Sequence, residues 1–155
     1  MYFIYHLSTI VFGVFLIFFY LQKLLSRNSR SSAIVWVAYI IFGIGLMALN
    51  VVPVMPIVRT IYTWLGILVL CKVCYRSAPL NAVYVATVFC ALALITELLC
   101  LKLLAIMGWE YLDVMSPGYE RAIYILIAKV CQLALVIIAV PLMHLSLIHI
   151  SEPTR

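Results

Sequence analysis

Residues 82–107 read AVYVATVFCALALITELLCLKLLAIM, and this stretch decides the fold class of the chain. Glu97 and Lys102 are its only charged members. About 20 consecutive apolar residues are enough for a helix to cross the hydrocarbon core of a bilayer. A strand of a membrane barrel would instead alternate apolar and polar residues, and this stretch does not. The stretch therefore predicts a transmembrane α-helix.

Four more apolar runs of similar length accompany this one. Hydrophobic residues make up 68% of the 155-residue chain and charged residues 10%, and the mean hydropathy is +1.24. Soluble domains carry about 25% charged residues, so the composition excludes a soluble domain, and a nucleic-acid-binding module with it. We expect an all-α polytopic membrane protein in a lipid bilayer, with about five transmembrane helices. Their predicted ranges are residues 2–21, 33–52, 57–73, 82–107 and 122–144.

The charges between the runs predict an orientation. Basic residues without any acid follow the first and third runs. The loops after the second and fourth hold three acids, all of them after the fourth, and Arg121, and Arg59 lies just inside the third run. Because Lys and Arg accumulate in cytoplasmic loops, we expect a multi-pass protein of the plasma membrane with its N-terminus outside. Trp109, Tyr111 and Tyr119 suit an aromatic belt at the outer surface. The basic residues are Lys23, Arg27, Arg30, Lys72 and Arg76, and the acids are Glu110, Asp113 and Glu120.

Ionisable residues inside the apolar runs are the candidate site residues. Each costs roughly 2.5–3.5 kcal/mol to insert, so such side chains usually face a cavity or a partner. At 1.5 Å per residue, Glu97 and Lys129 lie roughly 15 Å and roughly 12 Å from the outer ends of their helices. The candidates for a ligand pocket or an ion pair are Arg59, Glu97, Lys102 and Lys129, together with Gln132 one turn from Lys129.

Two arrangements of these residues fit the sequence. In the first, Glu97 and Lys129 form a buried pair at the floor of an outward pocket, because their helices are joined by a loop and reach similar depths. Lys102 lies about 140° around the helix from Glu97 and is expected to extend to the membrane surface. In the second arrangement the ion pair is purely structural, and Arg59 and Lys102 both extend to the surface.

The sequence predicts no enzyme activity, metal site or cofactor for this chain. It contains no phosphate-binding loop, no dinucleotide fingerprint, no serine-hydrolase elbow and no zinc-protease motif. The five cysteines suggest neither a disulfide framework nor a zinc site. Cys71 and Cys74 have the spacing of a redox motif, but at a helix end packing or lipidation explains them better. No catalytic residue is assigned.

The last residues, LSLIHISEPTR (145–155), resemble the in-frame translation of an adaptor used in sequencing-library preparation. The resemblance implies that they are non-native and that residues 1–144 are the N-terminal part of a longer, truncated protein. We therefore expect the membrane bundle to comprise residues 1–144.

The layout resembles the membrane sensor region of Gram-positive GHKL-type sensor histidine kinases, among them the accessory-gene-regulator peptide receptors. The resemblance rests on the basic first loop LQKLLSRNSR (21–30), on tight hairpins, and on the acid within LITELLCLKLLAIMG (94–108) before an acidic outer loop. It implies the signal-sensing region of a two-component system, as in quorum sensing. The implied signal is an extracellular peptide or small molecule, and the implied kinase is a homodimer. Its phospho-accepting histidine and ATP-binding motifs would follow the membrane region.

Two other classes of protein remain open. A fragment of a multi-helix transporter or permease would also carry intramembrane Glu and Lys residues, although no broken helices are paired across repeats. A small membrane protein that only binds partners would end near His144. The sequence that follows His144 in the intact gene would separate the three classes.

Overall fold

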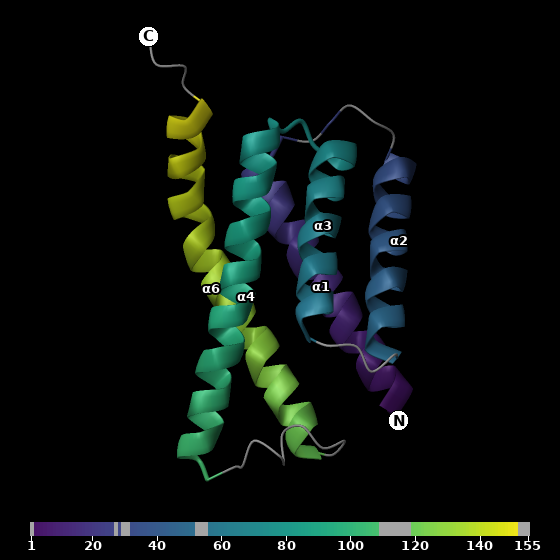
Figure 1. The fold of residues 1–155 in the computed structure, drawn as a ribbon, viewed down its shortest axis with the longest axis vertical. Helices are drawn as coiled ribbons and strands as arrows, with labels where there is room; N and C mark the ends of the chain where they lie inside the picture. The colour runs from purple at the N-terminus through teal and green to yellow at the C-terminus, as the bar shows by residue number, and fades with distance from the viewer. Residues whose placement is uncertain (1, 27, 29–31, 52–55, 109–118, 152–155) are drawn as a thin grey trace.

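The computed structural model describes residues 2–26, 28, 32–51, 56–108 and 119–151, and it is built from helices (Figure 1). Five of them are long and apolar enough to cross a membrane. This confirms the predicted all-α polytopic membrane fold. The helices are α1 (Tyr2–Leu24), α2 (Ser32–Val51), α3 (Pro56–Cys74), α4 (Pro79–Ile106) and α6 (Tyr119–Ser151).

Several helices extend beyond the predicted ranges, for local reasons. Helix α1 continues to Leu24, so that Lys23 lies in its last turn, and Lys72 occupies the last turn of α3. A cation there is favoured by the partial negative charge of the exposed carbonyl groups. Helix α4 begins at Pro79, because proline in a first turn lacks only an N–H that would be unpaired anyway.

Helix α6 is longer than predicted at both ends. It begins at Tyr119, passes Pro141 and continues to Ser151. Residues 145–151, which resemble an adaptor translation, are thus helical in this structure. The Tyr84 hydroxyl of α4 even donates a 3.2 Å hydrogen bond to the Ser146 hydroxyl. The resemblance concerns the origin of these residues, and it stays a prediction.

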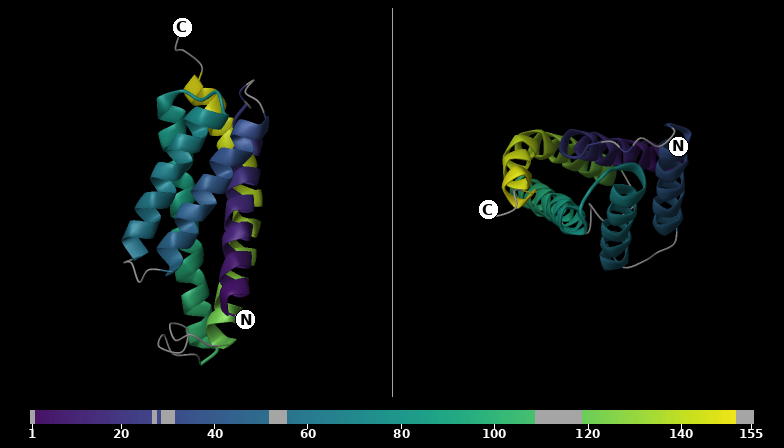
Figure 2. Two further views of the ribbon diagram at one scale, coloured as in Figure 1. Left: turned by 90° about the vertical axis from the view of Figure 1, so that its right-hand side faces the viewer. Right: turned by 90° about the horizontal axis from the view of Figure 1, so that it is seen from above.

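The five helices form a ring. Each helix contacts the next along the chain, and α6 closes the ring by packing against α1. The view from above in Figure 2 shows this order of the helices around the bundle. Large apolar side chains on the outside, such as Trp36, Ile41, Ile44 and Leu98, are exposed as lipid-facing residues would be.

The two ends of the bundle differ in charge and in packing. The end where α1 and α3 finish carries Lys23, Lys72 and Arg76, and we call it the basic end; the end where α1 begins is the N-terminal end (Figure 1). At the basic end the Asn28 N–H donates to the Cys74 carbonyl at 3.0 Å, and the Arg76 N–H donates to the Ser26 carbonyl at 3.0 Å. The chain segments that follow α1 and α3 are therefore joined by main-chain hydrogen bonds.

The most deeply buried side chains also gather near the basic end. Several are completely enclosed by their neighbours, and Tyr20 of α1 lies among them with its ring 5.0 Å from that of Phe89 in α4. Toward the N-terminal end, α4 and α6 extend beyond the first residues of α3 (Figure 1). The completely enclosed residues include Leu16, Tyr20, Leu21, Ile67, Cys71, Cys74 and Val85.

Some sequence predictions fall outside the described residues. Arg27 and Arg30 of the first basic loop lie there, as do Glu110 and Asp113 of the acidic loop and the aromatic residues Trp109 and Tyr111. The orientation with the N-terminus outside stays a prediction that rests on the sequence.

Candidate functional site

The candidate site centres on Lys129 of α6. Its side chain is half-buried, and its ammonium group donates a 3.1 Å hydrogen bond to Oε1 of Gln132, one turn further along the helix. Gln132 is itself only 6% exposed. Two polar side chains are therefore held together in a membrane-spanning segment, where an unpaired polar group would be costly.

Helix α1 makes room for the lysine with a glycine. A Cβ atom built on Gly13 would lie 4.0 Å from Nζ of Lys129, so the ammonium group lies against a part of α1 that has no side chain. Gly13 is in the middle of α1, and α1 and α6 are the two helices that close the ring. Nothing in the sequence indicated this contact, since a glycine in an apolar helix has many possible causes.

Glu97 of α4 lies on the side of its helix that faces the bundle, yet it is exposed. Cys90 and Leu104, seven residues before and after it, are buried at 9% and 2% exposure. A spacing of seven residues returns to nearly the same face of a helix. The exposure of Glu97 therefore indicates that the space beside the inner face of α4 is open at this depth, toward the N-terminal end.

Electrostatic interactions connect Glu97 and Arg59 to Lys129. The carboxylate of Glu97 and the guanidinium of Arg59, in the first turns of α3, both lie within electrostatic range of the Lys129 ammonium group, the first with opposite charge and the second with the same charge. Arg59 is exposed, and its main-chain carbonyl accepts a 2.9 Å hydrogen bond from the Thr63 hydroxyl. We call Arg59, Glu97, Lys129 and Gln132 the Lys129 cluster.

The structure differs from the expected buried pair of Glu97 and Lys129. Glu97 is exposed, and neither side chain forms a direct ion pair within the described part of the chain. Lys129 donates to Gln132 instead. The physical reason is helix rotation: a count of residues gives the depth of each charge along its helix, but not the direction in which its side chain points. Water or a ligand can then replace a direct partner for the carboxylate.

Lys102 is not part of the cluster. It lies on the exposed surface of α4, five residues beyond Glu97. Its long side chain can reach the membrane surface at the N-terminal end. Of the five candidate residues, the structure thus groups Arg59, Glu97, Lys129 and Gln132 and leaves Lys102 apart.

Two cysteines beside the cluster interact. Cys100 of α4 is completely buried, and its thiol lies close to that of Cys131 in α6. The sequence analysis assigned neither of them a role. Their similar depth in two adjacent antiparallel helices was the available signal for the contact. Both are free thiols.

The chemistry available to the Lys129 cluster is binding. Two cations and one carboxylate leave it a net positive charge, so it favours an anionic group. The amide of Gln132 supplies a hydrogen-bonding partner that fixes the lysine. Within the described ranges, no three His, Cys, Asp or Glu residues are grouped as metal ligands.

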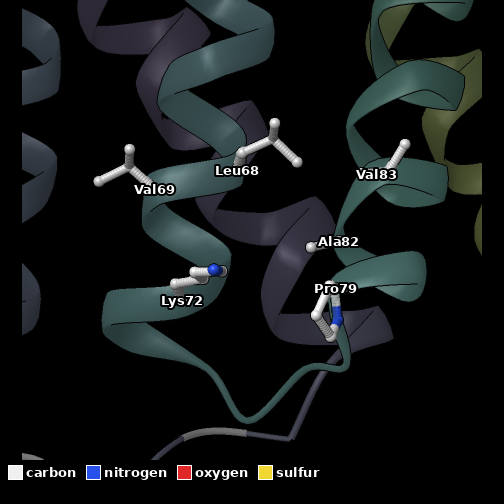
Figure 3. A pocket seen from close by; sticks show the side chains of 6 residues that line it. All are labelled: Leu68, Val69, Lys72, Pro79, Ala82 and Val83. Carbon is white, nitrogen blue, oxygen red and sulfur yellow. The ribbon is translucent and has the colours of Figure 1, made fainter.

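A separate cavity lies at the basic end, between α3 and α4 (Figure 3). It is not the outward pocket that the sequence predicted, and it contains none of the five candidate residues.

Comparisons with family models, curated proteins and solved structures find no match to this chain.

Proposed function

We propose that this membrane bundle receives an extracellular signal for a sensor histidine kinase, and that the Lys129 cluster recognises an anionic group of that signal. The signal is a peptide or a small molecule with a carboxylate or a comparable anion. The receptor lies in the plasma membrane with its N-terminus outside, and the intact kinase acts as a homodimer.

The observation that carries this proposal is the position of the Lys129 cluster. Its residues come from α3, α4 and α6, and the lysine lies beside Gly13 of α1. Glu97 and Arg59 are both exposed, and they lie toward the N-terminal end of the bundle. An anion that enters there would meet a cationic site within the membrane, where screening by salt is weak.

The ring supplies a route from ligand binding to helix movement. Lys129 lies at the contact between α1 and α6, the first and last of the described helices. An anion that draws the Lys129 ammonium away from Gly13 would change how these two helices pack. Such a ligand shifts the equilibrium between the two helix packings only as far as its affinities for them differ.

A fusion receptor tests the proposal. Residues 1–144 are joined to the catalytic region of a histidine kinase that drives a reporter gene in cells. Synthetic peptides with a free C-terminal carboxylate are compared with the same peptides as C-terminal amides. We expect carboxylate peptides to change the reporter output, and the change to be lost in Lys129→Gln. Lys102→Gln is the matched control and should respond like the unchanged fusion.

Three results would count against the proposal. These are equal responses to acids and amides, a response that survives Lys129→Gln, and an equal loss in Lys102→Gln. Uptake of the labelled peptides into proteoliposomes that contain the chain would favour a transporter instead. Sequencing of the genomic locus past the codon for His144 gives an independent test, since a histidine-bearing coiled coil and ATP-binding motifs are expected there.

A further inference from the structure

The cavity at the basic end is a groove between the last turns of α3 and the first turns of α4. Its volume is about 330 Å³, which lies within the roughly 300–1,000 Å³ range of ligand-binding pockets. Figure 3 shows Lys72 and Pro79 nearer the turn that joins the helices, with Leu68 and Val83 deeper along the groove. The lining residues are Leu68, Val69, Lys72, Pro79, Ala82 and Val83.

The lining suits a hydrocarbon chain. All of its residues except Lys72 are apolar, and Val69 and Val83 are 59% and 42% exposed on its sides. The groove lies in segments long and apolar enough to span a membrane, so its natural contents are lipid chains. Ala82 is only 2% exposed, and its small side chain leaves the space that a larger residue would fill.

The mouth of the groove suits a negative charge. Lys72 is exposed there and has no carboxylate partner in the part of the chain that the structure describes. Arg76 follows four residues later, and Lys23 lies at the same end of the bundle. A basic side chain at a membrane surface attracts anionic lipid headgroups.

We infer that this groove binds an anionic phospholipid, whose acyl chain lies along Val69, Ala82 and Val83 and whose phosphate contacts Lys72. The apolar lining favours the acyl chain of a lipid, and Lys72 favours a negatively charged headgroup. This lipid site is independent of the Lys129 cluster, which lies toward the other end of the bundle.

The test is lipid binding to the purified chain in detergent, measured by native mass spectrometry. The probes are palmitoyl-oleoyl phosphatidylglycerol, which is anionic, and palmitoyl-oleoyl phosphatidylcholine, which is zwitterionic. We expect the anionic lipid to bind about fivefold more tightly, the effect of one basic residue at a membrane surface. Lys72→Gln should remove this preference, and Lys72→Arg should keep it.

Two further variants separate the groove from the general charge of the basic end. Val83→Trp narrows the groove at an exposed position and should weaken both lipids. Lys23→Gln removes a charge at the same end but outside the groove, and should leave the preference unchanged. Equal binding of the two lipids would overturn the inference, as would a loss of preference in Lys23→Gln equal to that in Lys72→Gln. Displacement of the lipid by inorganic phosphate alone would also overturn it.

Discussion

The hydroxyl of Tyr20 in α1 donates a 2.9 Å hydrogen bond to the carbonyl oxygen of Val85 in α4, and both residues are completely buried. The sulfur of Met143 in α6 lies 3.2 Å from the same hydroxyl. One side chain of α1 thus contacts two helices that are distant from it in sequence. In a membrane, where lipid is as apolar as a leucine side chain, packing and such hydrogen bonds drive helix association.

Tyr20→Phe removes this hydrogen bond and keeps the ring. We expect the free energy of unfolding in bicelles to fall by about 0.5–1.5 kcal/mol. Tyr20→Ala should cost about 3–5 kcal/mol, because it also leaves a cavity. Steric trapping of the unfolded state measures both values. An unchanged stability in Tyr20→Phe would mean that the hydrogen bond contributes nothing.

The contact between α2 and α3 depends on two glycines. The rings of Phe42 and Tyr62 stack with their centroids 5.6 Å apart and an interplanar angle of 3°. A Cβ on Gly66 would collide with the Phe42 ring, and a Cβ on Gly45 would collide with the Tyr62 hydroxyl. These two glycines let the rings lie close to the facing helix.

Gly66→Ala should therefore destabilise the bundle by about 1–3 kcal/mol, the usual cost of overpacking. Gly43→Ala is the matched control. Its Cβ would meet Val14 at an ordinary 3.4 Å, and alanine favours a helix over glycine by about 1 kcal/mol. The change in the free energy of unfolding should thus have opposite signs in Gly66→Ala and Gly43→Ala. Equal changes in the two variants would contradict the packing argument.

The helices of this chain could be predicted from its sequence, but their arrangement could not. The length of each apolar run is enough to predict the helix that crosses the membrane there. Which side of a helix faces the protein is hidden, because lipid-facing and core-facing residues are equally apolar: Leu98 is 63% exposed and Leu104 is 2% exposed. A helix that is apolar on all sides carries no pattern that fixes its rotation.

The same limit applies to the candidate site. The depths of Glu97 and Lys129 followed from counting residues, so their electrostatic interaction was within reach of sequence analysis. Direct contact depends on helix rotation, which is not visible in the sequence. The Gln132 partner was visible, since a residue three positions along a helix lies on the same face.

A double-mutant cycle distinguishes the observed partner of Lys129 from the expected one. The coupling between Lys129→Met and Gln132→Leu should be about 1 kcal/mol, within the range measured for hydrogen bonds inside membranes. The coupling between Lys129→Met and Glu97→Gln should be below about 0.5 kcal/mol, because the pair is not in direct contact and Glu97 is exposed. A larger coupling energy for Lys129 with Glu97 than for Lys129 with Gln132 would instead support the buried ion pair.

The orientation can be read from two exposed positions at opposite ends of the bundle. Arg76 lies at the basic end, and Met107, at the end of α4, is 70% exposed. In a cysteine-free background, a membrane-impermeant maleimide added to intact cells should label Met107→Cys. It should label Arg76→Cys only after permeabilisation, because basic segments stay in the cytoplasm. The opposite pattern would invert the topology.

The contact between Cys100 and Cys131 gives a direct test of the pairing of α4 with α6. Their thiols lie close to one another, so a mild oxidant that accepts two electrons and two protons should join them in a disulfide. The experiment uses a variant in which Cys71, Cys74 and Cys90 are serine, and digestion followed by mass spectrometry identifies the joined peptides.

We expect the disulfide within one chain, at protein concentrations low enough to separate the molecules. Cys131→Ser in the same background is the control and should yield no such product. Because Cys100 is completely buried and Cys131 half-buried, the reaction should be slow with a charged oxidant and faster with one that enters the bilayer. A disulfide formed only between two chains would show that α4 and α6 pair across a dimer, and the closed ring of one chain would then be wrong.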